Sequence, residues 1–250
     1  MKIESKNNSK LKMLTFLQTK KGRKERNAYL IEGMHMVREA VLNGVELEEI
    51  FVAESAKELV LPKIEGAMCD ITTVSDEAFA KVSNTINSQG VLAVAKIPAE
   101  EPVFAGNKFL VLDRIQDPGN MGTIIRTAAA TGFVHIICVG CVDVFNPKVV
   151  RSSSSGLFFV KLHTMTEEKL LEFSRTHTLL TASAEGENVF EFSGVPESFG
   201  LVIGNEANGV SENIKNVSKV IALPMDGKVE SLNAAVSASV LMYVLSFCKK

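Results

Sequence analysis

Hydrophobic and polar positions divide the chain into two blocks of alternating helices and strands. In the first block, leucines three residues apart predict a helix over residues 9–19, and short apolar runs bounded by polar residues predict strands. A further helix is expected after Ser75, which suits the N-cap position, with Glu77 in its first turn. The strands expected in this block are 28–33, 49–54, 70–75 and 91–97, and a further helix is expected at 33–44.

The second block contains longer apolar strands separated by helical segments. Such strands are typical of a parallel sheet covered by helices on both faces. Residues 98–107 contain two prolines and a glycine and read as a linker. We therefore predict an α/β protein with a small domain at 1–97 and a larger, mostly parallel domain at 108–250. The strands expected in the larger domain are 109–113, 134–140, 157–162, 178–184, 201–206 and 220–225.

Composition places the chain among ordinary globular proteins. It has 250 residues, of which 46% are apolar and 22% charged, and its beginning resembles neither a secretory signal nor a transit peptide. The most apolar segment, Leu232 to Cys248, is interrupted by polar residues and is shorter than a membrane span, so it reads as a buried helix. Four cysteines do not make a disulfide scaffold. We expect a cytoplasmic protein that has no membrane partner.

Cys138 and Cys141 form a C-x-x-C pair in and just after a predicted strand. A structural zinc site needs four ligands, and neither a second cysteine pair nor a pair of histidines lies near these residues. We expect ordinary packing here and no metal site.

Positive charge is concentrated at the N-terminus. The formal net charge is only −2, but residues 1–30 hold nine basic and two acidic residues, whereas the rest of the chain holds 18 basic and 27 acidic ones. Such a segment can bind a phosphate backbone, because each Lys or Arg that meets a phosphate releases counterions. A solvated helix face would have the same composition, so charge alone leaves both interpretations open. The candidate RNA-binding side chains are Lys20, Lys21, Arg23, Lys24 and Arg26.

Polar or glycine-rich segments follow the predicted strands of the second block. They are "DRIQDPGNMG", "SAEGEN", "GNEANGVS" and "PMDGKVESLNAA". Ligands of open α/β sheets bind at the carboxyl ends of the strands, where these segments would gather. Neither a P-loop pattern nor a G-x-G-x-x-G opens a helix, and no Ser-His-Asp set is present. The sequence therefore predicts a ligand site without a common nucleotide-loop signature.

Three stretches, taken together and in order, resemble the motifs of a known family. "NMGTIIRTAAATGF", "LVIGNEANGVS" and "ALPMDGKVESLNAAVSASV" resemble the three motifs of the SpoU (TrmH-like) family of S-adenosylmethionine-dependent RNA ribose 2'-O-methyltransferases. The resemblance covers residues 108–250. Residues 1–97, with "NAYLIEGMHMVREAV", resemble the ribosomal-protein-L30e-like RNA-binding domain that many rRNA-modifying members carry.

The resemblance implies a trefoil-knotted fold in which the loops of the second and third motifs pass through one another. These loops then form the pocket for S-adenosyl-L-methionine, which main-chain groups hold for the most part. Glycines at 204, 209 and 227 would permit the close backbone approaches that such a pocket requires. The cofactor-binding residues implied are Thr181, Ala182, Gly204, Leu223 and Leu232.

The reaction that the resemblance implies is an attack of a ribose 2'-hydroxyl on the methyl carbon of a sulfonium. Such a site must position the hydroxyl and deal with its proton. In the family, the residue that matches Arg126 has been proposed as a general base. A guanidinium stays protonated in proteins, however, so binding a phosphate while stabilising the alkoxide is an equally good role for Arg126. The alternative is that Arg126 only forms a structural ion pair with Glu206. The implied catalytic residues are Asn120, Arg126, Glu206, Ser231 and Asn233.

Two classes of function stay open. The first is an active RNA 2'-O-methyltransferase, expected to act on 23S rRNA, with a tRNA enzyme or an antibiotic-resistance rRNA methyltransferase as alternatives. The second is a non-catalytic RNA-binding or ribosome-assembly factor with the same fold. Either would bind RNA rather than DNA. The resemblance also implies a homodimer formed through the C-terminal helix, which carries more apolar and small residues than one buried face requires.

Overall fold

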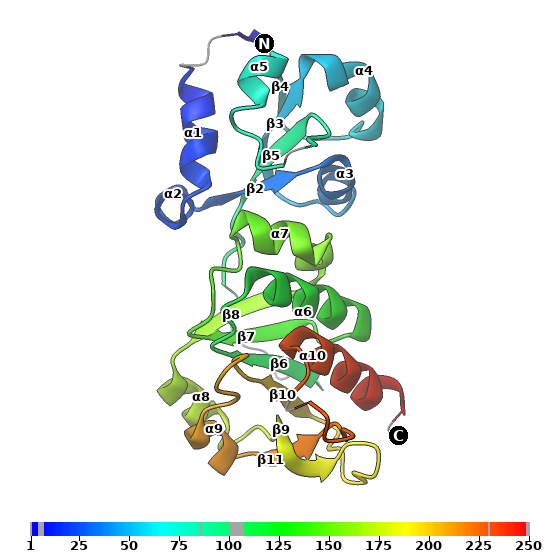
Figure 1. Cartoon of the computed structure of the whole chain (residues 1–250). Coiled ribbons are helices and arrows are strands. Elements are labelled where there is room, and N and C mark those ends of the chain that lie inside the picture. Colours follow the sequence, from blue (N-terminus) through cyan, green and yellow to red (C-terminus); the bar gives the residue numbers. More distant parts are fainter. Residues whose placement is uncertain (1, 5–7, 86, 101–107, 230, 249–250) are drawn as a thin grey trace. The chain divides into compact units, whose positions relative to one another are not determined.

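The structure is a computed structural model that describes residues 2–4, 8–85, 87–100, 108–229 and 231–248 (Figure 1). Its contacts divide the chain into two compact units. The first contains Met1–Ala99 and Asp143–Phe158, and the second contains Glu100–Val142 and Phe159–Lys250. The segment Asp143–Phe158 thus groups with the first unit, although its sequence position falls within the predicted larger domain. Most of the expected linker, residues 101–107, lies outside the described residues, and the domain boundaries stay a prediction.

The first unit is built on a mixed five-stranded sheet in the order β1-β4-β3-β5-β2. Strands β1, β4 and β3 run parallel to each other, and β5 is antiparallel to both β3 and β2. The elements are β1 (Lys2–Ile3), α1 (Ser9–Leu17), α2 (Lys20–Arg26), β2 (Ala28–Glu32), α3 (Met34–Leu42), β3 (Leu47–Ala53), α4 (Lys57–Val60), β4 (Asp70–Val74), α5 (Asp76–Phe79), β5 (Val91–Lys96) and α7 (Pro147–Ser153).

The leucines whose spacing predicted the first helix are the residues that pack it against this sheet. Leu11, Leu14 and Leu17 of α1 are buried in one cluster with Phe51 and Leu92 of the sheet. The expected helix 9–19 is thus confirmed as α1, but a separate basic helix, α2, follows it. The break occurs at Thr19, whose hydroxyl accepts a hydrogen bond from the N–H of Gly22 and caps α2.

The second unit is built on a six-stranded sheet in the order β11-β9-β10-β6-β7-β8, with every pair parallel. The chain builds β6, β7 and β8 outward and then crosses to the other side of β6, so the order reverses between β6 and β10. Ligands of such sheets bind at this point of reversal. The elements are β6 (Lys108–Asp113), α6 (Pro118–Thr131), β7 (His135–Val139), β8 (Lys161–Met165), α8 (Glu167–Phe173), β9 (Leu179–Asn188), β10 (Phe199–Ile203), α9 (Glu212–Asn216), β11 (Lys219–Ala222) and α10 (Ala234–Tyr243).

Helices cover both faces of this sheet, as the apolar strands predicted. Phe109 and Val111 of β6 are buried in one cluster with Leu170 of α8 and Ile214 of α9. Because side chains alternate along a strand, Leu110 and the other even-numbered residues of β6 point to the opposite face. Helices α6 and α10 pack against each other on that side (Figure 1).

Two expectations for the strands were wrong. The strand expected at 178–184 was expected to end at residue 184, but residues 185–188 continue β9, and the pairing of β9 with β11 shifts register between Val220 and Ile221. A run expected as a strand at 157–162 begins instead with a 3-10 turn, Gly156–Phe159, and β8 starts only at Lys161. Ser154 and Ser155, both at positive φ, turn the chain just before it.

The C-terminal helix was expected to be buried, and it is buried on one side only. Ala238 and Leu241 of α10 are inside the unit, but Val236 and Tyr243 are about half exposed, at 50% and 51%. Among the described residues, no helix is both long enough and apolar enough to cross a membrane.

Candidate active site

Three of the predicted catalytic residues lie in one chain of side-chain hydrogen bonds. The amide nitrogen of Asn233 donates to the amide oxygen of Asn120 at 2.9 Å, and the amide nitrogen of Asn120 donates to Oε1 of Glu206 at 2.9 Å. We call these three side chains the amide relay. They come from the segments that follow β11, β6 and β10, so the relay joins all three motif segments at one edge of the sheet.

Asn120 is positioned by the first turn of α6. The helix begins at Pro118, whose missing N–H costs nothing at that position. Asp117 is the N-cap, and its Oδ1 accepts a hydrogen bond from the backbone N–H of Asn120 at 2.8 Å. Cap and proline together fix the backbone from which the Asn120 side chain projects.

Asn233 is fixed as the N-cap of α10. Its Oδ1 accepts hydrogen bonds from the N–H groups of Ala235 and Val236 at 2.9 and 3.2 Å. This leaves its amide nitrogen as the group that reaches Asn120. Both ends of the Asn233 amide are therefore used, one for the helix and one for the relay.

Glu206 lies in a tight loop, and the contacts that hold this loop were not predicted from the sequence. Asn205 holds this loop, because its Oδ1 accepts from the N–H groups of Ala207 and Asn208 while its Nδ2 donates to the carbonyl of Arg114 at 2.8 Å. The loop closes so tightly that a Cβ on Gly204 would lie 2.2 Å from the carbonyl carbon of Gly209. Only glycine fits there.

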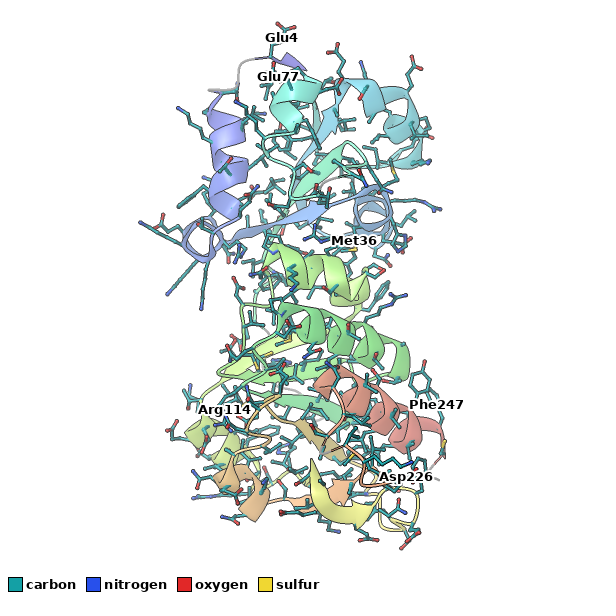
Figure 2. All side chains as sticks on the ribbon, in the orientation of Figure 1. Glu4, Met36, Glu77, Arg114, Asp226 and Phe247 are labelled. Atoms are coloured by element: carbon teal, nitrogen blue, oxygen red, sulfur yellow. The ribbon has the colours of Figure 1, made fainter. Side chains whose placement is uncertain are left out.

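A buried carboxylate supports the same edge. Asp113, fully buried at the end of β6, accepts hydrogen bonds from the Arg114 guanidinium at 2.9 Å and from the N–H of Ser211 at 2.8 Å. Arg114 has a φ of 57°, which is rare for a side chain larger than glycine. Figure 2 labels Arg114 at the margin of the second unit. Neither role was predicted, although "DR" at the end of an apolar strand was the available signal.

A pocket of about 360 Å³ lies beside the relay. Four of the five predicted cofactor residues line it, namely Ala182, Gly204, Leu223 and Leu232. Thr181 does not; it is fully buried, and its hydroxyl has no hydrogen-bond partner among the described residues. The other lining residues are Ser183, Ala184, Ile203, Asn205, Glu206, Ala207, Gly209, Val210, Lys215, Ile221, Met225, Ser231, Ala234, Ser237 and Leu241.

The pocket suits an adenosine-containing ligand. Ile203, Ile221 and Leu223 offer an apolar surface for a base, while small residues and glycines leave main-chain groups within reach. Its size falls within the ordinary range for small-molecule sites. The lining therefore fits S-adenosylmethionine held largely by the backbone.

Arg126 stands apart from the relay. It is exposed on α6, and it forms no hydrogen bond or ion pair with any other residue that the structure describes. The ion pair considered between Arg126 and Glu206 is not formed, because Glu206 accepts from Asn120 instead. The guanidinium keeps its donors available.

The basic residues of α2 do not all share one environment. Lys20, Lys21, Lys24 and Arg26 are exposed, whereas Arg23 is only 3% exposed. The Arg23 guanidinium donates to the carbonyls of Leu17 and Gln18 at 2.9 and 2.8 Å and to Oδ2 of Asp143 at 2.9 and 2.6 Å. Arg23 was predicted to bind RNA, but its guanidinium is buried and already paired with Asp143, so it is not among the exposed basic side chains of α2.

The C-x-x-C pair packs at the end of β7. The Cys141 thiol donates to the carbonyl of Leu112 at 3.1 Å, and Cys138 is buried. A hydrogen bond between the two thiols, together with burial, raises the pKa of Cys138 well above its usual value, and the same hydrogen bond lowers the pKa of Cys141. The pair helps to hold the loop after β7 against β6.

Comparison with known proteins places this site in a family. The sequence pattern of the SpoU rRNA Methylase family matches residues 107–243, and that of an MRM3-like substrate binding domain matches residues 8–93. RlmP of Bacillus subtilis strain 168, a 23S rRNA (guanosine(2553)-2'-O)-methyltransferase, is 34% identical over 248 residues, which cover 97% of this chain and 98% of RlmP.

Solved structures agree with this assignment. An AdoMet-bound rRNA methyltransferase from Sinorhizobium meliloti superposes with a TM-score of 0.87 at 24% identity, over 98% of this chain and 97% of that one. An RNA 2'-O ribose methyltransferase gives 0.83 at 28% identity, over 98% of both chains. The chain therefore belongs to the SpoU rRNA methylase family. The predicted fold class, a knotted α/β methyltransferase domain preceded by a small α/β domain, is confirmed.

Proposed function

We propose that the chain transfers the methyl group of S-adenosylmethionine to a ribose 2'-hydroxyl of 23S rRNA. The observation that carries the proposal is the position of the amide relay, which places Asn120, Asn233 and Glu206 beside a pocket that suits the cofactor. The specificity of the Bacillus relative for a 23S guanosine supports the choice of substrate. An enzyme that modifies ribosomal RNA would act in the cytoplasm.

The residues of the site divide between holding the cofactor and presenting the ribose. Bound S-adenosylmethionine supplies a methyl carbon activated by its sulfonium. The main chain around Gly204 and Leu223, together with Ala182 and Leu232, holds the cofactor. Glu206 contributes negative charge toward the sulfonium, and the relay keeps that carboxylate in one place. Ser231 also lines the pocket, where its hydroxyl can hydrogen-bond to the ligand.

Arg126 acts on the RNA rather than on the cofactor. It does not line the pocket, and its guanidinium has no protein partner among the described residues. The planar, charged guanidinium of Arg126 can bind a phosphate of the target nucleotide and stabilise the alkoxide as the 2'-hydroxyl loses its proton. This role requires no deprotonated arginine, which proteins do not provide.

Arg126→Ala is expected to abolish methyl transfer and leave S-adenosylmethionine affinity nearly unchanged. Loss of such a transition-state interaction costs about 10²–10³ in rate. Arg126→Lys should be almost as damaging, because lysine keeps the charge and loses the planar fork. Single-turnover methylation of rRNA and calorimetric titration with S-adenosylmethionine measure the two quantities. Arg175→Ala, at another exposed arginine of the same unit, serves as the control. Equal loss of cofactor binding and catalysis in Arg126→Ala would show a structural role.

The exposed side chains of α2 are proposed to bind the phosphate backbone. Changing Lys20, Lys21 and Lys24 to Glu should weaken RNA binding and flatten its dependence on salt, because fewer counterions are released. Cofactor affinity should stay the same. The matched control reverses Lys57, Lys63 and Lys81, three exposed lysines elsewhere in the same unit. Filter binding at several salt concentrations measures the effect, and equal losses in both triple variants would indicate only a change of net charge.

An apolar stripe on the C-terminal helix supports a homodimer. Val236, Val240, Tyr243 and Phe247 are spaced by four, three and four residues, so they share one side of the helix, and they are 37–60% exposed. Phe247 lies in the π-helical turn, Val244–Cys248, that continues α10, and Figure 2 labels it near the C-terminal end of the chain. A stripe of this kind on an otherwise packed helix suits burial against a second copy.

Light scattering is expected to give twice the chain mass of 27.1 kDa at micromolar concentration. Val240→Glu should shift the mass to that of one chain, because a carboxylate in an apolar interface loses its hydration. Met68→Glu, at a 98% exposed methionine of the other unit, should leave the mass unchanged. A wild-type protein that stays monomeric would contradict the proposed dimer.

A further inference from the structure

The pocket beside the relay has charged side chains from two different elements. Among its described lining residues, only Glu206 and Lys215 are charged. Glu206 is bonded to Asn120 at the start of α6, whereas Lys215 belongs to α9. Helix α9 packs through Ile214 on the sheet face that α8 covers, and α6 lies on the other face. The negative charge of the pocket thus comes from the loop after β10, and the positive charge comes from α9.

Lys215 is arranged to act on a ligand. Its side chain is 23% exposed, so most of it is covered, and the residue lines the pocket. The only partner that the described residues give Nζ is Oε1 of Glu212 at 2.9 Å. Glu212 is 77% exposed, and an exposed pair of this kind contributes little to stability. An ammonium has three donors, so two remain for another acceptor.

The proposed cofactor has charges that match this arrangement. S-adenosylmethionine carries one anionic group, the carboxylate of its methionine moiety, and two cationic groups, the sulfonium and the ammonium. We propose that Lys215 binds the methionine carboxylate and so turns the sulfonium toward Glu206 and the relay. This inference rests on the proposed function, because it names the group of the same cofactor that Lys215 recognises. Lys215 is thus a positioning residue that touches the cofactor away from the methyl group.

Decarboxylated S-adenosylmethionine provides the test, because it lacks only the carboxylate. Calorimetric titration of the full chain with each compound should show that the wild type prefers S-adenosylmethionine. Lys215→Met should weaken binding of S-adenosylmethionine about 10-fold to 100-fold, which is the range for a hydrogen bond to a charged group, and leave binding of the decarboxylated compound unchanged. Lys219→Met, which removes an exposed lysine that does not line the pocket, should change neither affinity.

The outcomes separate this inference from the proposed function. Equal weakening of both compounds by Lys215→Met would make Lys215 a structural residue and overturn the inference, as would unchanged binding of both. In either case wild-type binding of S-adenosylmethionine would leave the methyltransferase proposal standing. A wild-type protein that binds neither compound would instead overturn the proposed function, and the assignment of Lys215 with it. Thermal unfolding of the unliganded variants checks that Lys215→Met is folded.

Discussion

The hydrogen bonds of Asn120 are the interaction on which the arrangement of the site depends. One amide group accepts from Asn233 and donates to Glu206, so the helix starts of α6 and α10 and the loop after β10 are held together by a single side chain. Neither aspartate nor leucine could replace it, since the first has no donor and the second has neither donor nor acceptor. Each such bond contributes only about 1 kcal/mol to stability, somewhat more at a carboxylate. Its main effect is to fix where the Glu206 carboxylate points.

The relay can hold these segments because the backbone brings them close first. The reversal of strand order places the ends of β6 and β10 side by side, and Asp113 then binds the N–H of Ser211 across the gap. Gly204 lets the loop after β10 fold back onto Gly209 without a side chain in the way. The pocket is therefore walled by main chain and small residues, which explains why a cofactor site exists without a recognisable nucleotide-binding sequence.

Most of the fold and part of the site could be predicted from the sequence, because some residues carry a local pattern and others depend on distant contacts. Buried apolar runs at 109–113 and 134–140 predicted strands because burial on both faces leaves an unmistakable pattern. The strand residues 185–188 were missed, since their pairing with β11 across a register shift depends on a distant segment.

Contacts between distant residues also decide how individual charged residues behave. Arg23 looked like its basic neighbours on α2, and only its contact with Asp143, 120 residues away, shows that it is buried. Asn205, Arg114 and Lys215 were missed for the same reason, because their partners or their place in the pocket follow from loop geometry. The alternative of an ion pair between Arg126 and Glu206 is not formed, because Glu206 accepts a hydrogen bond from Asn120 instead.

Ribose-methylation mapping of total RNA tests the central claim most directly. RNA from cells that contain the gene is compared with RNA from cells that lack it, and with RNA from cells in which the wild-type gene has been restored. The account predicts that one 2'-O-methyl group disappears from 23S rRNA with the gene and returns with it, while tRNA stays unchanged. Identical maps in the presence and absence of the gene would contradict it.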